Sequence, residues 1–291
     1  MNDQAVCCYR HPDRETGIRC TRCERPICPD CMVSASVGFQ CPECAGGGGA
    51  GGGTGAGPRA TAPRTIAGSV HVADPRLVTK IILAVNAGLW IAVMAGGEGL
   101  LSALEMLGRA RVVDGGPLEG VAEGQWYRLL SAAFLHQRPE HIALNMISLW
   151  WLGPPLEVAL GRLRFVVLYV LSALGGSALS YLVAAPNQPS LGASGAIFGL
   201  LGATAVLMHR LKYDMRPIIA LLVLNLIFTF TWSDIAREAH IGGLVVGAAV
   251  AFGMVHAPRG RRALVQWGTA GAALVVIAAM VFVRTQELTG G

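Results

Sequence analysis

Long apolar stretches dominate the chain from about residue 75 onward. They cover residues 77–97, 141–160, 165–185, 194–211, 217–232, 239–256 and 264–283. Each stretch is close to the ~20 residues that an α-helix needs to cross roughly 30 Å of hydrocarbon. The pattern therefore predicts seven transmembrane helices. The long mixed segment at 98–140 contains Trp126, Tyr127 and Arg128 and is expected to lie in the membrane interface.

Composition supports a membrane protein. Of the 291 residues, 53% are hydrophobic and only 14% are charged, and the mean hydropathy is +0.51. An ordinary soluble domain is more polar than this. Because no apolar stretch precedes residue 75, we expect no cleavable signal peptide.

The composition changes along the chain and divides it into four predicted parts. Residues 1–45 form a Cys-rich domain, and residues 46–74 form a flexible linker rich in glycine. Residues 75–258 form a core of six membrane helices, and 259–291 add a seventh helix with a short tail. The predicted fold class is all-α, with a small metal-binding domain ahead of the membrane core.

Charged residues predict the orientation of the helices. Lysine and arginine lie before the first span and after the second, fourth and sixth, although arginines in the long first loop weaken the bias. Cytoplasmic loops retain basic residues, so we expect a multi-pass protein of the plasma membrane with its N-terminus in the cytoplasm and its C-terminus outside. The formal net charge of +5 is explained by these loops, and no nucleic-acid partner is expected.

All eight cysteines lie between Cys7 and Cys44. Such a cluster forms disulfides in a secreted protein and a metal site in a cytosolic one, and the predicted orientation favours metal. The predicted ligands come in four pairs with two-residue spacing, enough for two structural Zn²⁺ ions: Cys8 and His11, Cys20 and Cys23, Cys28 and Cys31, Cys41 and Cys44. Cys7 is left over and is expected to be a thiol outside the ligand set, unless it replaces Cys8.

This Cys-rich head resembles a B-box-type zinc finger. The resemblance implies interleaved pairing, with the first and third pairs on one ion and the second and fourth on the other; the spacing alone leaves sequential pairing open. A head this small has little apolar core, so zinc is expected to supply most of its folding free energy. We expect it to bind a cytosolic protein.

Two polar residues at membrane depth stand out. Ser194 opens the fourth span and His240 opens the sixth. A serine in a membrane helix usually bonds to its own backbone, and a single histidine is as often structural as functional. Glycines spaced four apart in both spans, at 195 and 199 and at 243 and 247, favour close approach of the two helices. We therefore expect a serine nucleophile next to its general base, near the outer face.

The second span supplies groups for an oxyanion site. His136 precedes it, and His141 and Asn145 are four residues apart on one helix face. Such groups can donate hydrogen bonds to a developing oxyanion. The alternative for Asn145 is a hydrogen bond between helices.

Together, these residues resemble the rhomboid family of intramembrane serine proteases over most of the chain after about residue 77. The resemblance rests on a set of motifs in this order: Trp126-Tyr127-Arg128, His136 with His141 and Asn145, Gly192-Ala193-Ser194-Gly195, and Ala239-His240 with Gly243 and Gly247. It implies a catalytic dyad of Ser194 and His240 that cleaves transmembrane substrates near the outer ends of their helices. It also implies an oxyanion hole of His141, Asn145 and the Ser194 backbone N–H, and structural roles for His136, Trp126 and Arg128. No catalytic cofactor is implied.

One residue departs from the family pattern, and two acidic residues near His240 raise the question of a third catalytic residue. Well-known members carry tyrosine four residues after the serine, whereas Phe198 stands here and can stack on the base without donating a hydrogen bond. Asp234 and Glu238 lie just before His240, but we interpret them as solvated carboxylates of a short loop and predict no third catalytic acid.

Two other functions are alternatives to proteolysis: silent binding of membrane proteins and transport. A catalytically silent relative that binds or escorts membrane proteins usually lacks the serine or the histidine, and both are present here. A transporter is expected to carry polar residues along a path at mid-membrane, whereas these lie near one face.

Overall fold

The computed structural model describes residues 6–35, 38–45, 65–69, 74, 76–231 and 236–290. The chain divides into two compact units, Met1–Ala60 and Thr61–Gly291, which are considered separately below. Most of the predicted linker at 46–74 lies outside the described residues.

The first unit is built around its cysteines. The 3-10 helix η1 (Pro29–Cys31) leads into an antiparallel hairpin of β1 (Val33–Ser34) and β2 (Phe39–Gln40), and α1 (Pro42–Ala45) follows. The buried cluster consists of five cysteines and Ile27. A core with one aliphatic side chain buries too little apolar surface to fold by the hydrophobic effect alone.

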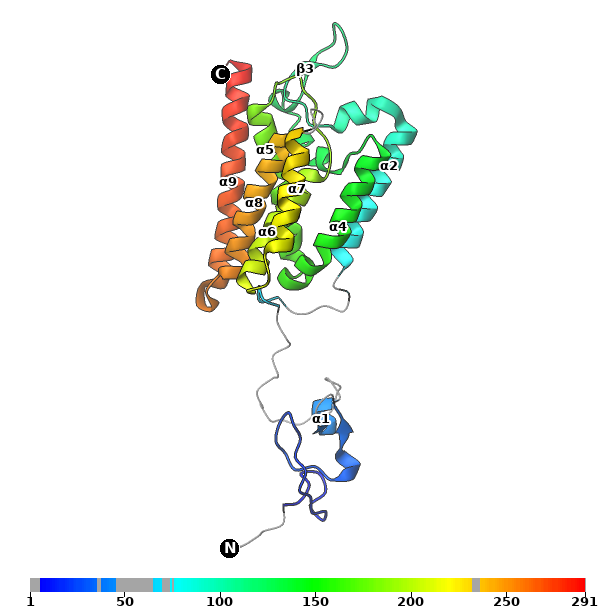
Figure 1. The fold of residues 1–291 in the computed structure, drawn as a ribbon, viewed down its shortest axis with the longest axis vertical. Coiled ribbons are helices and arrows are strands. Elements are labelled where there is room, and N and C mark those ends of the chain that lie inside the picture. Colours follow the sequence, from blue (N-terminus) through cyan, green and yellow to red (C-terminus); the bar gives the residue numbers. More distant parts are fainter. Residues whose placement is uncertain are drawn as a thin grey trace. The chain divides into compact units, whose positions relative to one another are not determined.

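The second unit is a bundle of long helices (Figure 1). Its helices, listed in order along the chain, are α2 (Leu77–Leu104), α4 (Pro139–Leu160), α5 (Arg162–Val183), α6 (Ser194–Arg210), α7 (Arg216–Thr231), α8 (Arg237–His256) and α9 (Arg262–Thr289). Within the described residues, a helix therefore overlaps each of the seven predicted ranges. By length and composition, α2, α5, α8 and the segment Arg259–Thr289 can cross a membrane, and α7 is a shorter apolar helix.

Small residues bring α5, α6 and α8 together at the centre of the bundle. A side chain at Gly247 would collide with the backbone of Gly199, and one at Gly243 would collide with the backbone of Gly195. The predicted glycine spacing therefore corresponds to a contact in which two helix backbones touch, as in membrane helix pairs generally.

The first helix continues past its predicted end at residue 97. At Gly97 the backbone leaves the helical region, with φ of 69° and ψ of −165°, and a second helical stretch runs on to Leu104. Glycine adopts this conformation without the steric penalty of a side chain. The apolar pattern predicted that the helix ends at Gly97, whereas the structure has a kink there.

The long loop between α2 and α4 is ordered by one buried arginine. It contains β3 (Ala110–Arg111) paired with β4 (Leu118–Glu119), η2 (Val121–Glu123), α3 (Arg128–Ser131) and η3 (Ala132–Phe134). Arg128 is fully buried and donates to the carbonyls of Ser102 and Glu105 and to the Glu119 carboxylate. Trp126, by contrast, is 66% exposed. The loop is thus fastened to the end of α2 through Arg128.

At the opposite end of the bundle, α4 caps α2. The buried carboxylate of Glu157 accepts 2.9 Å hydrogen bonds from the backbone N–H groups of Val78 and Thr79 and from the Thr79 hydroxyl. These donors have no partner within their own helix because they belong to its first turn. The negative charge of the carboxylate also interacts favourably with the positive end of the α2 dipole, which lies at this N-terminus.

Residues 65–69 fall within the predicted flexible linker but pack against the membrane unit. Ala67 is fully buried; its N–H donates to the carbonyl of Ala159, and its carbonyl accepts from Gln266 of α9. The Ser69 hydroxyl donates to the carbonyl of Leu160. This part of the range 46–74 packs against the membrane unit, so the prediction of a linker extending to residue 74 is wrong at its C-terminal end.

Candidate active site

Ser194 and His240 lie side by side. The Ser194 Oγ and the His240 Nε2 are 2.8 Å apart, a hydrogen-bond distance. Ser194 is the first residue of α6 and is half-buried, whereas His240 in the first turn of α8 is 6% exposed. The two residues predicted as nucleophile and base are therefore brought together across 46 positions of sequence.

The glycine contact between α6 and α8 explains this short distance. Gly195 follows the serine directly, and Gly243 lies one turn after the histidine. Because these two positions carry no side chain, the helices approach to backbone contact at the level of the pair. Any larger residue would separate the helices and lengthen the Ser194–His240 hydrogen bond.

Two further side chains fix the imidazole of His240. The Phe198 ring stacks on it, with ring centroids 4.1 Å apart and planes inclined by 13°. Phenylalanine thus keeps the stacking expected at this position. On the other side, the Thr229 hydroxyl of α7 lies 2.8 Å from His240 Nδ1. Sequence analysis missed Thr229, because a threonine in an apolar helix resembles any other i−4 bonded hydroxyl.

The described carboxylate next to the base, that of Glu238, does not join the site. Glu238 forms an ion pair with Arg237 at 3.1 Å, and Asp234 lies outside the described residues. Within residues 236–290, no acid is hydrogen-bonded to His240.

Of the predicted oxyanion residues, His141 lies beside Gly192, close to the serine. Gly192 adopts φ of +126°, and a Cβ at this position would lie 2.8 Å from the His141 Nε2 and 3.7 Å from the Ser194 Oγ. Only glycine leaves this space free between the histidine and the nucleophile. The N–H of Gly192 donates to the carbonyl of Ala132, which fixes the loop before α6.

Asn145 is linked to His136 rather than standing alone. Its Nδ2 lies 3.0 Å from the Nε2 of His136, and both residues are buried. The rings of His136 and His141 pack edge to face with centroids 5.0 Å apart. His136 therefore contacts both of the other two side chains. One N–H of the Asn145 amide is used in this contact and the second remains for another acceptor.

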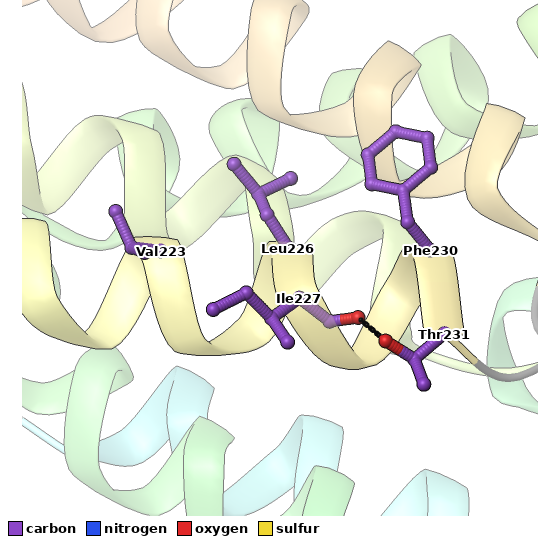
Figure 2. Close-up of a pocket in the computed structure, with 5 residues that line it drawn as sticks. All are labelled: Val223, Leu226, Ile227, Phe230 and Thr231. Carbon is purple, nitrogen blue, oxygen red and sulfur yellow. Dashed lines mark hydrogen bonds between the residues drawn. The ribbon is translucent and has the colours of Figure 1, made fainter.

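A shallow apolar groove runs along α7. Figure 2 shows its lining, with the Thr231 hydroxyl turned back to the carbonyl of Ile227. The lining residues are Val223, Leu226, Ile227, Phe230 and Thr231. Only Ile218 and Thr229 of α7 are buried, so α7 offers most of its surface to lipid or to a bound helix.

Two possible metal centres lie in the first unit, well defined by their ligand atoms. One group contains Cys8, His11, Cys28 and Cys31, and the other contains Cys20, Cys23, Cys41 and Cys44. In each group, all four ligand atoms lie within 4.8 Å of one another. The pairs are interleaved along the chain, as the B-box resemblance implied.

Distances within the groups suit a tetrahedral ion. The Sγ atoms of Cys23 and Cys41 are 3.8 Å apart, and the His11 Nδ1 lies 3.3 Å from the Sγ of Cys28 and 3.4 Å from that of Cys31. Tetrahedral sulfur ligands at ~2.3 Å from zinc are about 3.8 Å from each other. The donor set and its spacing therefore fit zinc.

The thiols of the two groups differ in acidity. Burial raises the pKa of the Cys8 thiol, but hydrogen bonds from the backbone N–H groups of Cys28, Arg10 and His11 outweigh burial and lower it to about 6. Burial and neighbouring thiols raise the pKa of Cys31 to about 11 and that of Cys44 to about 12. Each group thus resists ionising all its thiols until a cation compensates their charge.

Known proteins resemble the membrane unit. The Rhomboid domain family model matches residues 123–257. The chain is 33% identical over 181 residues to the putative rhomboid protease YdcA of Bacillus subtilis. The matched region covers 60% of this chain and 87% of that relative. This chain belongs to the rhomboid family.

Other relatives share only part of their length with this rhomboid chain. The rhomboid protease GluP of Bacillus subtilis is 40% identical over 141 residues, covering 46% of this chain and 27% of GluP. RHOMBOID-like protein 5 of Arabidopsis thaliana is 37% identical over 147 residues, covering 48% of this chain and 47% of that protein. Family membership and the apolar helices make the chain a multi-pass membrane protein related to intramembrane proteases.

Proposed function

We propose that this rhomboid protein is a serine endopeptidase that cleaves transmembrane proteins within the bilayer. The 2.8 Å contact between the Ser194 Oγ and the His240 Nε2 carries the proposal. A serine hydroxyl is a weak nucleophile until a neighbouring base takes its proton. Both residues are held by packed helices, α6 and α8.

The reaction follows from this geometry. The Ser194 Oγ attacks the peptide carbonyl carbon while His240 Nε2 accepts the proton of the serine hydroxyl. The carbonyl oxygen becomes negatively charged. His240 then gives the proton to the leaving amine, which departs and leaves an acyl-enzyme. A water molecule, deprotonated by the same nitrogen, then attacks the acyl carbon; the bond to the Ser194 Oγ breaks, and His240 returns the proton to this oxygen as the acid product leaves. No metal or cofactor takes part in these steps.

The oxyanion fits the space next to Gly192. We assign its donors to the side chains of His141 and Asn145 and to the Ser194 backbone N–H, which is unused at the first residue of a helix. The glycine keeps the space open, and the His136 contact holds the Asn145 amide.

The substrates are membrane helices cut near the outer face. We place the protein in the plasma membrane. The basic loops support an orientation with its N-terminus in the cytoplasm. The dyad then opens toward the outside, where water is available for hydrolysis. A substrate helix must unwind to expose a peptide bond, so helix-weakening glycine or proline near its outer end is favoured. The exposed apolar side of α7 is a suitable surface for its approach.

The Cys-rich head is proposed to hold two structural Zn²⁺ ions in a B-box-like arrangement. The two interleaved groups of four ligands support this assignment. We expect the folded head to bind a cytosolic protein and to have no part in the chemical step.

The test is labelling by a serine-directed fluorophosphonate, together with cleavage in liposomes. The reporter substrate carries one membrane helix with glycine and proline near its outer end. Wild-type protein should label and cleave, whereas Ser194→Ala and His240→Ala should do neither. Ser148→Ala changes a half-buried serine of α4 outside the site and should behave as wild type. Folded wild-type protein that neither labels nor cleaves would instead identify a silent binder of membrane proteins.

A further inference from the structure

The hydroxyl of Thr229 is the partner of the second nitrogen of the base. Its Oγ1 lies 2.8 Å from His240 Nδ1, and Thr229 is 2% exposed. We propose that Thr229 is a positioning residue that holds His240 in the tautomer able to accept the serine proton. This inference rests on the proposed function and adds a third, uncharged member to the site.

Counting protons decides the direction of these hydrogen bonds. Thr229 Oγ1 also lies 2.8 Å from the carbonyl oxygen of Asn225, one turn earlier in α7. A hydroxyl has one proton, and a carbonyl oxygen can only accept. Thr229 therefore donates to Asn225, and His240 Nδ1–H donates to Thr229.

The opposite arrangement leaves a contact unsatisfied. If Thr229 donated to Nδ1, two oxygen lone pairs would face each other at 2.8 Å inside a buried site. Two oxygens this close with no proton between them repel each other, and the contact is lost as a hydrogen bond. With the proton on Nδ1, Nε2 is bare and faces the hydroxyl of Ser194. All three contacts are then hydrogen bonds, and the base is ready to act.

Stacking and hydrogen bonding restrict different motions of the ring. Phe198 holds the plane of the His240 imidazole but permits a half-turn of the ring about its Cβ–Cγ bond, which keeps the plane. That turn would exchange the nitrogens for carbons and remove Nε2 from the serine. The Thr229 hydroxyl selects one of the two orientations, because only Nδ1–H can donate to it. Side chain and tautomer are thus fixed together.

The contact strengthens as the reaction proceeds. When Nε2 takes the serine proton, the imidazole becomes a cation and Nδ1–H becomes a charge-assisted donor. Thr229 keeps its own proton on the Asn225 carbonyl throughout, so no proton passes to α7. An interaction that grows toward the transition state raises kcat rather than substrate affinity.

Thr229 also links the base to the least buried helix around it. Ile218 and Thr229 are the buried residues of α7, and Ile218 lies in its first turn. Near the active site, α7 is thus held by the side chain that orients His240. An outward shift of α7 there would remove the acceptor of Nδ1–H.

The experiment compares three threonine substitutions in the full-length protein. Thr229→Val removes the hydroxyl with little change of shape, and Thr229→Ser retains it. Thr204→Val is the matched control, because the Thr204 hydroxyl of α6 donates to the carbonyl of Leu200 in its own helix, as Thr229 does in α7, but lies outside the proposed site. Steady-state cleavage of the reporter in liposomes gives kcat and KM for each.

We expect Thr229→Val to lower kcat by about 10- to 100-fold at unchanged KM, the range for losing one hydrogen bond to a charged group. Thr229→Ser should stay within about threefold of wild type, and Thr204→Val should not differ from it. A wild-type kcat in Thr229→Val would overturn the proposal. So would a Thr229→Ser protein as slow as Thr229→Val.

A spectroscopic measurement separates this proposal from the proposed function. The ring ¹⁵N resonances of His240, assigned by their loss in His240→Ala, report which nitrogen carries the proton. Wild type and Thr229→Ser should show protonated Nδ1 and bare Nε2, and Thr229→Val should show both tautomers. Bare Nδ1 in the wild type overturns the role of Thr229, even if the protein is an active protease. Protonated Nδ1 supports it, even if no cleavage is found.

Discussion

Replacing Gly243 with alanine tests whether backbone contact between α6 and α8 sets the geometry of the dyad. The added Cβ would lie 2.7 Å from the carbonyl carbon of Gly195 and closer still to its oxygen. Ordinary contact begins at 3.4 Å. The two helices must therefore separate by at least about 0.7 Å, the difference between these distances, because overpacked atoms are relieved by backbone shifts.

This separation is enough to break the catalytic hydrogen bond. The Ser194–His240 distance of 2.8 Å would rise to about 3.5 Å, beyond the roughly 3.2 Å at which the base is effective. Loss of general-base catalysis lowers the rate by about 100-fold or more. The same overpacking should destabilise the fold by about 1–3 kcal/mol.

The assay is the initial rate of fluorophosphonate labelling, with thermal unfolding in detergent measured on the same samples. Gly88→Ala is the matched control, because no atom lies within 4 Å of a Cβ at this position in α2. Gly88→Ala should label at the wild-type rate. If folded Gly243→Ala labels as fast as wild type, then backbone contact at this glycine does not control the dyad.

Three further predictions concern separate parts of the molecule. Phe198→Ala should lower kcat about two- to twelvefold by removing the ring stacked on His240, and Phe198→Tyr should not; equal rates for all three would deny stacking a role. Glu157→Gln should destabilise the fold by about 1–3 kcal/mol in thermal unfolding without abolishing labelling, because an amide N–H₂ cannot accept from Thr79 as a carboxylate does; an unchanged melting temperature would contradict this. Purified protein should contain about two zinc ions per chain by elemental analysis and Cys20→Ser about one, whereas an unchanged content would exclude that residue as a ligand.

Periodicity and spacing were sufficient to predict the helices and to identify the paired residues. The apolar stretches coincide with helices because a membrane requires every backbone group to be bonded within its own segment. Ser194 and His240 stood out because each polar group in such a stretch is costly. Interleaving of the metal ligands followed from the B-box resemblance, since spacing alone could not choose it.

The features that sequence could not supply depend on contacts distant in the chain. Thr229 looks like an ordinary threonine of a membrane helix until α8 is placed beside it. Ala67 belongs to a polar segment that reads as linker, and its burial depends on Gln266, 199 positions later. Gly97 marks a kink rather than an end, because helix resumes after one residue of unusual backbone.

The contact between Glu157 and the first turn of α2 constrains how the protein is assembled. The chain reaches Thr79 first and Glu157 only 78 residues later, so ribosome and insertion machinery handle α2 before its partner exists. Until α4 arrives, the first N–H groups of α2 depend on water at the membrane surface, and α4 in turn carries an acidic group that has no partner of its own. Each helix completes the other, which makes α2 and α4 a single unit of membrane insertion rather than two independent spans.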